Sequence, residues 1–304
     1  MALTSSREHL MREEDSSRFA DVGAVVAARL PGYQVRSVAL LGEGQDNTAY
    51  EVNGELIVRF GKEADPVAVD HEARLLATIA EISPLPVPKP LFAVAELGCV
   101  AYSRLPGLPL IDLPASERPV NDGSVATVLG RFLDTLHRVP LGVVDGLVPI
   151  DDQPKDAWLR EAAETYEAIA DHVPKAHRPA VAAFLEEAAP SGGNPLVFSH
   201  NDLGIEHVLV DPATREVTGV IDWSDAAITD PAYDFGLLYR DLGPGFLDSA
   251  LLAYRPATDG TEELRTRSVF YARCAVLEDL AYGLEPGHDK YLVKSLDAFR
   301  WLYP

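Results

Sequence analysis

The sequence predicts an α+β protein in two parts, a small part built on an antiparallel sheet and a larger, mainly helical part. Short strand-like apolar runs follow one another between residues 35 and 60, and Asn53-Gly54 between two of them is a strong signal for a two-residue hairpin turn. Beyond residue 107 most apolar residues recur at helical spacing. Because the composition changes near residues 102–107, we expect domains at residues 1–103 and 104–304.

The first part is expected to hold two helices and a meander of strands. A helix capped by Ser16 or Ser17 should end at Pro31-Gly32, and a second should begin at Asp65-Pro66 and end before Ser83-Pro84. The strands are expected at residues 35–41, 48–52, 55–60, 91–94 and 99–105.

Three features of this first part are candidates for contact with a nucleotide. Gly42-x-Gly44 at a hairpin tip would offer backbone N–H groups to phosphates, although a plain turn explains the same glycines. Arg59 on a strand could pair with Glu72 on the second helix, an arrangement that orients phosphate groups. The backbone of the expected hinge, which includes Tyr102 and Arg104, could hydrogen-bond the edge of a purine base.

The second part is expected to place helices before and after a central segment of short strands. These helices are predicted at residues 124–138, 158–170, 176–189, 237–242, 246–254, 262–282 and 291–301. His137, near the end of the first of them, is expected to make a structural hydrogen bond or to cap the helix.

The charge of the chain restricts the partners it can have. The formal net charge is −21, which disfavours nucleic acid and anionic membranes and is compatible with a cationic ligand or with a merely soluble surface. No apolar run is long enough to span a membrane, and the first residues lack the apolar core of a signal peptide. Cys99 and Cys274 are expected to be buried free thiols, so we expect a cytoplasmic protein.

The most informative stretch is the segment from residue 196 to residue 223. An apolar run ends in Ser199-His200-Asn201-Asp202, a second run follows at 208–210, and a third ends in Asp222-Trp223. The carboxylates of Asp202 and Asp222 are therefore expected at the ends of neighbouring strands. Phosphoryl-transfer enzymes place a base and a magnesium ligand in this way.

The motifs together resemble the aminoglycoside phosphotransferase family, which has a protein-kinase-like fold. His200-x-Asp202 with His207 five residues on, Ile221-Asp222-Trp223, and Asp230-Pro231-x-x-Asp234 match successive elements of that family. Leu41-Gly42-x-Gly44-x-x-Asn47 is similar to its nucleotide loop, so the functional interpretation of the two glycines is preferred. The resemblance implies a two-lobe fold with a nucleotide-binding lobe followed by a catalytic and substrate-binding lobe.

The same resemblance implies a role for each motif residue. Asp202 would be the catalytic base, His200 would brace its loop, and Asp234 would be structural. Asp222 would bind magnesium that bridges the nucleotide phosphates. The cofactors implied are ATP or GTP and magnesium, and Asn47, Arg59 and Glu72 would belong to the nucleotide site.

Two residues depart from the family pattern. His207 stands where most members have asparagine as a second metal ligand, and imidazole is a poor magnesium ligand, so the metal is held mainly by Asp222 and phosphates or reaches His207 through water. Arg59 stands where lysine is usual, although arginine also binds phosphate. Both departures are similar to macrolide kinases. A zinc site made of His200, Asp202 and His207 is disfavoured because the helical zinc motif is missing.

The substrate is expected to be a small-molecule antibiotic, with a polycationic aminoglycoside as the leading class. The candidate substrate ligands are carboxylates that could equally be surface charges, namely Glu206, Asp225, Asp241, Glu278 and Asp279. A macrolide is the main alternative, because Tyr271, Tyr282 and nearby leucines could line an apolar cleft. A nucleotide-binding pseudokinase is a third hypothesis, which the presence of both Asp202 and Asp222 disfavours.

Overall fold

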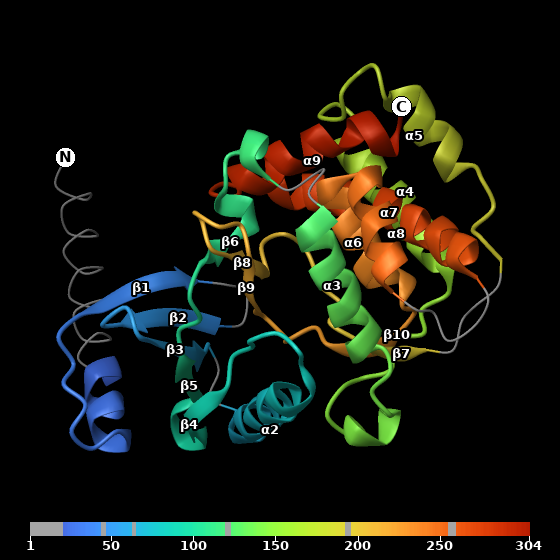
Figure 1. The fold of residues 1–304 in the computed structure, drawn as a ribbon. Helices are drawn as coiled ribbons and strands as arrows, with labels where there is room; N and C mark the ends of the chain where they lie inside the picture. Colours follow the sequence, from blue (N-terminus) through green and yellow to red (C-terminus); the bar gives the residue numbers. More distant parts are fainter. Residues whose placement is uncertain (1–20, 44–46, 63–64, 119–122, 192–195, 255–259) are drawn as a thin grey trace, which may run out of the picture. The chain divides into compact units, whose positions relative to one another are not determined.

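The computed structural model describes residues 21–43, 47–62, 65–118, 123–191, 196–254 and 260–304 (Figure 1). The described residues form two compact units, one within residues 1–80 and 88–105 and the other within residues 81–87 and 106–304. No described helix is long and apolar enough to cross a membrane.

The first unit is an antiparallel sheet of strand order β1-β2-β3-β5-β4 with helices beside it (Figure 1). Its strands are β1 (Val38–Glu43), β2 (Asn47–Val52), β3 (Leu56–Gly61), β4 (Pro90–Val94) and β5 (Cys99–Ser103), and its long helix is α2 (Pro66–Ile82). The predicted helix and meander are thus confirmed, except that the first strand begins at Val38 and not at residue 35. The proposed caps Ser16 and Ser17 lie outside the described residues.

Alternation along the strands separates an apolar face from a polar one. Val58 and Ala101 join a core with Val22 and Val26 of the helical segment 21–29. Arg59, the next residue along β3, therefore lies on the opposite face of the sheet. The Asp65 side chain accepts hydrogen bonds from the N–H groups of residues 67 and 68, which explains why α2 begins there.

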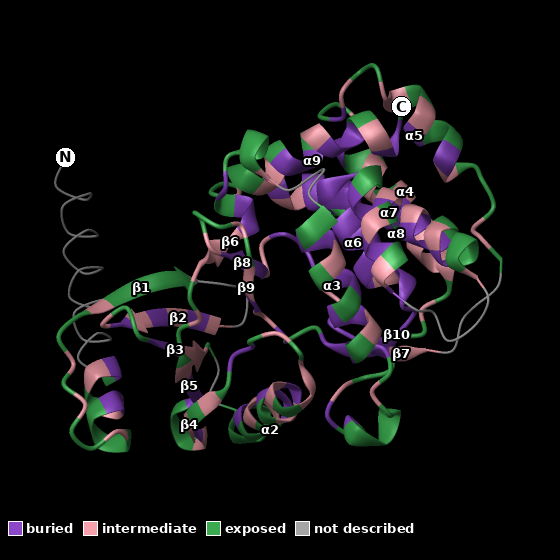
Figure 2. Ribbon diagram, in the orientation of Figure 1, coloured by how far each residue is buried: buried purple, intermediate pink, exposed green. Residues whose placement is uncertain are grey.

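The second unit is mainly helical. Its helices are α3 (Gly123–Leu136), α4 (Lys155–Ile169), α5 (Arg178–Leu185), α6 (Ala232–Leu242), α7 (Pro244–Ala253), α8 (Thr261–Gly283) and α9 (Asp289–Leu302). The helix α5 is shorter than predicted at both ends, and Pro179, which fits only a first helical turn, sets its start. Figure 2 shows that buried residues dominate α6, which packs against α7, α8 and α9.

Two small antiparallel sheets lie within this helical unit. One pairs β7 (Val197–Ser199) with β10 (Ala227–Thr229), and the other has the order β6-β8-β9, with β6 at Leu108–Pro109, β8 at Val208–Val210 and β9 at Val217–Val220. The sequence suggested that the strands preceding Asp202 and Asp222 are neighbours. This was wrong, because the two strands, β7 and β9, belong to different sheets. The reason is that β10, which the sequence pattern did not reveal, takes the place beside β7.

Candidate active site

The loop that follows β7 begins with a buried histidine. The Nε2–H of His200 donates to the carbonyl oxygen of Ile221 at 3.0 Å, and its Nδ1 accepts from the N–H of Asp202 at 3.3 Å. Burial lowers the pKa of His200 to about 4, although Asp234 opposes that shift. The neutral ring therefore ties the Asp202 loop to the segment that carries Asp222, and its bracing role in a reaction stays a prediction.

The carboxylate of Asp234 holds the backbone of the same loop. This residue lies in the first turn of α6 and is fully buried. Its oxygens accept the N–H of Asn201 at 2.8 Å and the N–H of His200 at 3.1 Å, and Nε2 of His137 lies 3.3 Å away. Asn201 has a φ of 63°, a strained value for a residue with a side chain. Asp234 and His137 thus make the structural hydrogen bonds expected of them.

Asp202, His207 and Asp222 come together around the imidazole ring. His207 Nδ1 lies 2.7 Å from the carbonyl oxygen of Asp202 and 3.3 Å from Asp202 Oδ2, while its Nε2 lies 3.7 Å from Asp222 Oδ2. The Asp202 and Asp222 side chains remain 38% and 41% exposed, so a ligand can reach both. The imidazole ring of His207 therefore lies between the two carboxylates and is close to both.

The electrostatics of this trio favour a carboxylate that can accept a proton. Desolvation raises the pKa of Asp202 to about 6, against the lowering effect of His207. Burial alone would lower the pKa of His207, but the carboxylates of Asp202, Glu206 and Asp222 outweigh it and raise that pKa. A carboxyl group whose pKa approaches neutrality is suited to general-base chemistry.

Asp222 is held in a specific backbone conformation after β9. Its φ is 60°, in the left-handed region, and the Ser224 hydroxyl donates to its Oδ1 at 2.8 Å. The N–H of Ile221 donates to the carbonyl oxygen of His207 at 2.9 Å, which aligns the two segments. Asp222 is thus positioned by local bonds that the sequence spacing alone does not reveal.

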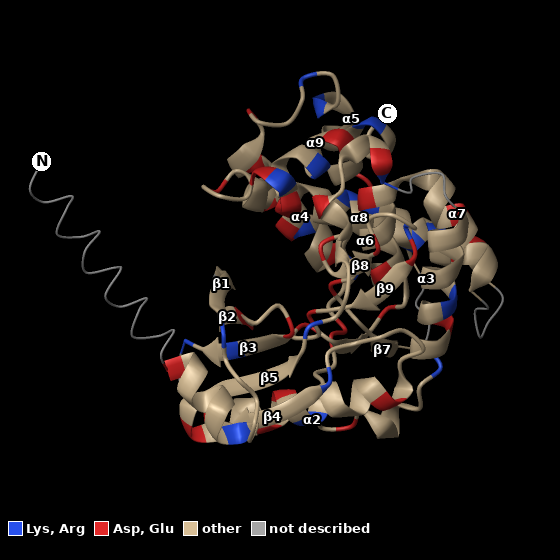
Figure 3. Cartoon of the chain, turned by 60° about the vertical axis from the view of Figure 1, so that its left-hand side comes forward, with Lys and Arg blue, Asp and Glu red and all other residues tan. Residues whose placement is uncertain are grey.

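Three of the predicted substrate carboxylates form a buried ion cluster. Glu206, Asp241 and Asp279 surround Lys294 Nζ, at 2.8, 3.4 and 3.2 Å respectively, and Arg240 also contacts all three. Figure 3 shows acidic positions recurring along the loops beside β8 and β9. Internal cations already neutralise much of this negative charge, and the role of the three carboxylates in substrate binding stays a prediction.

The remaining predicted substrate residues differ in burial, and Tyr271 among them is buried. Asp225 and Glu278 are exposed, and Tyr282 stacks on His288 with ring centroids 3.9 Å apart. Tyr271 packs edge-on against Trp158 and Tyr233. These three aromatic residues line a pocket of about 140 Å³ together with carboxylates and Lys155.

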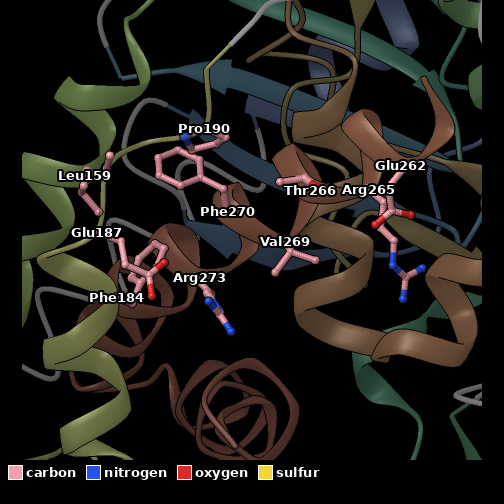
Figure 4. Close-up of a pocket in the computed structure, with 11 residues that line it drawn as sticks. Leu159, Phe184, Glu187, Pro190, Glu262, Arg265, Thr266, Val269, Phe270 and Arg273 are labelled. Atoms are coloured by element: carbon pink, nitrogen blue, oxygen red, sulfur yellow. The ribbon is translucent and has the colours of Figure 1, made fainter. Parts of the chain in front are cut away.

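A larger pocket of about 380 Å³ lies between α4, α5 and α8 (Figure 4). The ring centroids of Phe184 and Phe270 lie 5.9 Å apart there, and the Arg273 guanidinium lies over the Phe184 ring. None of the predicted site residues is among the described residues that line it. We therefore do not assign it to the reaction.

The first unit brings together the predicted phosphate-orienting pair. Arg59 Nη1 donates to Glu72 Oε1 at 3.1 Å, so β3 and α2 are joined as expected. Asn47 begins β2 opposite Gly61, and Gly42 has open space where a side chain would be. Gly44 lies outside the described residues.

The expected hinge residues are partly engaged within the first unit. The N–H of Arg104 donates to the carbonyl oxygen of Glu55 at 2.8 Å, and its side chain pairs with Glu51. Tyr102 lies in β5 opposite Ile57. Their roles in nucleotide binding stay predictions.

Sequence reasoning missed the residues that support the site from a distance. Lys294 and Arg240 were not singled out, and neither were Trp158 and Tyr233. The one available signal for Lys294 was its position in the apolar stripe of α9, four and eight residues before the buried Ala298 and Leu302. Among the described residues, no three His, Cys, Asp or Glu side chains form a group that could hold a metal ion by themselves.

The comparisons with known proteins agree with this fold. Residues 37–266 match the model of the phosphotransferase enzyme family. The chain therefore belongs to the phosphotransferase enzyme family. The predicted family and fold class, a two-lobe kinase-like α+β fold, are confirmed.

Individual relatives are more distant. A curated aminoglycoside 3'-phosphotransferase from Streptomyces fradiae is 28% identical over 173 residues, which are 54% of this chain and 53% of the relative. The chain thus aligns with about half the length of that relative. The GDP complex of aminoglycoside 2'-phosphotransferase-IIIa is 22% identical, with a TM-score of 0.70 over 93% of this chain and 97% of that one. A macrolide 2'-phosphotransferase from Brachybacterium faecium is 22% identical, with a TM-score of 0.65 over 93% and 98% of the two chains.

Proposed function

We propose that this chain transfers the γ-phosphoryl group of ATP or GTP to a hydroxyl group of a small-molecule antibiotic, with an aminoglycoside as the leading class. The observation that carries this proposal is the meeting of Asp202 and Asp222 around His207 in a member of a phosphotransferase family. A nucleotide-dependent reaction of this kind belongs in the cytoplasm, and two buried free cysteines are compatible with that location.

Asp202 is the proposed catalytic base. The substrate hydroxyl would lie against its exposed carboxylate and lose its proton to it as the oxygen attacks the γ-phosphorus. A new oxygen–phosphorus bond forms while the bond between the γ-phosphorus and the bridging oxygen breaks, and the electron pair leaves with the nucleoside diphosphate. His200 and Asp234 take no part in the transfer itself. Their hydrogen bonds keep the loop that presents Asp202 in its strained conformation.

Asp222 fits a magnesium site that is completed by the nucleotide. Magnesium favours one or two carboxylates together with water and phosphate oxygens, and the half-exposed Asp222 carboxylate supplies such a ligand. When bound, the ion would neutralise charge that develops on the phosphates. Imidazole is a poorer magnesium ligand than a carboxylate, and the His207 ring already lies between Asp202 Oδ2 and Asp222 Oδ2, at 3.3 and 3.7 Å. We therefore favour Asp222 as the main protein ligand, with His207 contacting the two carboxylates.

Residues 1–103 are the proposed nucleotide-binding lobe, and residues 104–304 are the proposed catalytic and substrate-binding lobe. The ion pair of Arg59 and Glu72 leaves a guanidinium suited to phosphate oxygens. Gly42, Gly44 and Asn47 would form the phosphate loop, and the segment with Tyr102 and Arg104 would meet the base. Solved relatives that contain GDP or ADP are compatible with this assignment.

The substrate is proposed to lie along α8. Tyr271, Glu278 and Tyr282 are separated by helical spacing, so they share one face of this helix. The aromatic pocket of Trp158, Tyr233 and Tyr271 offers surfaces on which an amino group or a sugar ring can pack. Exposed Asp225 and Glu278 would then bind substrate cations. Relatives solved with kanamycin and gentamicin make the aminoglycoside class the first to test.

A macrolide is the second candidate, and the ion cluster favours it. Lys294 and Arg240 occupy the centre of the carboxylate group that would otherwise attract a polycation. A macrolide has only one amine to neutralise. The arginine at position 59 and the histidine at position 207 are also similar to macrolide kinases.

The test is an assay that couples nucleoside diphosphate release to a panel of aminoglycosides and macrolides, with ATP and GTP and with magnesium titrated. We expect turnover with at least one aminoglycoside and a product that gains one phosphoryl group by mass spectrometry. Turnover with macrolides alone would establish the second candidate. If no panel member reacts and the nucleotide binds without magnesium, the pseudokinase hypothesis replaces both.

A further inference from the structure

The helix α6 holds the candidate catalytic loop at two points. Asp234 accepts the N–H groups of His200 and Asn201 at the start of the loop, and Asp241 accepts the N–H of Ile205 at 3.0 Å. The two aspartates are seven residues apart, so they lie on the same face of the helix, about 10 Å apart along its axis. The segment that carries Asp202 is therefore hydrogen-bonded to Asp234 at one end and to Asp241 at the other.

The second attachment point is bound by two cations, Arg240 at 2.7 and 3.0 Å and Lys294 at 3.4 Å. Asp241 is buried beside Arg240 and Lys294, and these two cations hold its pKa well below the ordinary value, against the effect of burial. Lys294 reaches this position from α9 with a side chain that is only 1% exposed. Its three N–H donors face three carboxylates, and its ammonium lies over the ring of Tyr291.

Lys294 also fixes Glu206, which lies directly before His207. Its Nζ lies 3.0 Å from Glu206 Oε1 and 2.8 Å from Glu206 Oε2, so the ammonium contacts both oxygens. The carboxylate folds back over the loop, and a Cβ at Gly204 would lie 2.5 Å from Oε1. Glycine at position 204 is therefore needed for the position that Lys294 imposes on Glu206.

We propose that Lys294 is a positioning residue, which holds the segment 204–207 through Glu206 and Asp241 and so keeps the side chains of Asp202 and His207 in place relative to one another. In the described part of the chain, Lys294 has no contact with Asp202 or His207. It acts through its ion pair with Glu206 and through Asp241, which accepts the N–H of Ile205. The last helix of the chain is thereby coupled to the reaction centre. The part of this inference that concerns turnover rests on the proposed function, and the part that concerns loop order does not.

The first test compares Lys294→Met with Lys290→Met. Both lysines are on α9, but Lys290 is 65% exposed and pairs with Asp112 at the surface, which makes it a matched control. We expect Lys294→Met to lower kcat roughly 10- to 100-fold with little change in the KM for nucleotide, because a misplaced base impairs chemistry more than binding. Lys290→Met should retain wild-type kcat. A folded Lys294→Met enzyme with wild-type kcat would refute the proposal.

A second test uses Lys294→Ala with added ethylammonium ion. The small cation can enter the space that the lost side chain leaves among three carboxylates, and we expect it to restore part of kcat, whereas sodium at the same ionic strength should not. If the variant regains stability with ethylammonium but kcat does not rise with it, Lys294 is only structural and the proposal fails.

A third readout needs no activity at all. Hydrogen exchange in the Lys294→Met protein should accelerate at the amides of Ile205 and His207, while the amides of His200 and Asn201, which Asp234 holds, should stay protected. Uniform acceleration at all four amides, or none at any, would contradict the proposal. If the wild-type protein shows no turnover, the proposed function fails, and this measurement still decides the positioning role.

Discussion

Replacing Asp234 by asparagine should show how much the strained loop depends on one buried carboxylate. The wild-type oxygens accept the N–H groups of His200 and Asn201, and the His137 ring lies against one of them. Asparagine keeps one carbonyl oxygen but turns an NH2 group toward a donor. A hydrogen bond to a buried charge contributes about 1.5–3 kcal/mol, and an unsatisfied buried donor costs about as much. We therefore expect Asp234→Asn to lower the free energy of unfolding by about 2–4 kcal/mol.

The measurement is urea unfolding of Asp234→Asn, with Asp248→Asn as the control. Asp248 is exposed and pairs with Arg265 on the surface, so its replacement should change the unfolding free energy by less than about 1 kcal/mol. We also expect a large loss of kcat in Asp234→Asn, since the Asp202 loop would relax from the φ of 63° at Asn201. A destabilisation below about 1 kcal/mol together with wild-type kcat would refute the reasoning.

Three further predictions follow from other contacts. The pKa of His200 is about 4, against 6.5 for a free histidine, so the unfolded chain binds the extra proton first as the pH falls. The contribution of the neutral ring to the free energy of unfolding is therefore complete above pH 6.5 and is lost as the pH falls toward 4. Between pH 7 and pH 4.5 the unfolding free energy of the wild-type protein should fall by about 2 kcal/mol more than that of His200→Gln, measured by urea unfolding at each pH. Equal pH slopes would contradict this. Arg59→Met should raise the KM for nucleotide by roughly tenfold and leave the KM for antibiotic unchanged, because it removes the phosphate donor and unpairs Glu72; an unchanged nucleotide KM would remove Arg59 from the site. Glu278→Gln should raise the KM for a polycationic aminoglycoside several-fold, with a smaller effect on a macrolide, and an equal effect on both would count against a cation contact.

Local patterns in the sequence were sufficient for much of the fold. The hairpin at Asn53-Gly54, the helix that starts at Asp65-Pro66 and the pairing of Arg59 with Glu72 all follow from turn chemistry, capping and strand alternation. These features depend on residues that are close in the sequence or on adjacent elements. That is why they could be predicted without any knowledge of the tertiary structure.

The support of the active-site loop could not be predicted in the same way. Asp202 and Asp222 were expected at neighbouring strand ends, but β10 pairs with β7 and the two carboxylates meet through His207 instead. Lys294 lies nearly ninety residues beyond Glu206, so its burial depends on how α9 packs. A lysine in an apolar stripe indicates burial, but the sequence does not say which carboxylates it will meet.

The central claim, that Asp202 is the base, is tested most directly by the Asp202→Asn enzyme. The measurement is single-turnover phosphoryl transfer to the best substrate of the panel, with nucleotide affinity measured on the same preparation. Because the amide cannot accept the hydroxyl proton while Asp222 and Arg59 remain in place, we expect transfer to fall by roughly 100-fold or more with nucleotide affinity nearly unchanged. Transfer at the wild-type rate in a folded Asp202→Asn enzyme would show that another group is the base.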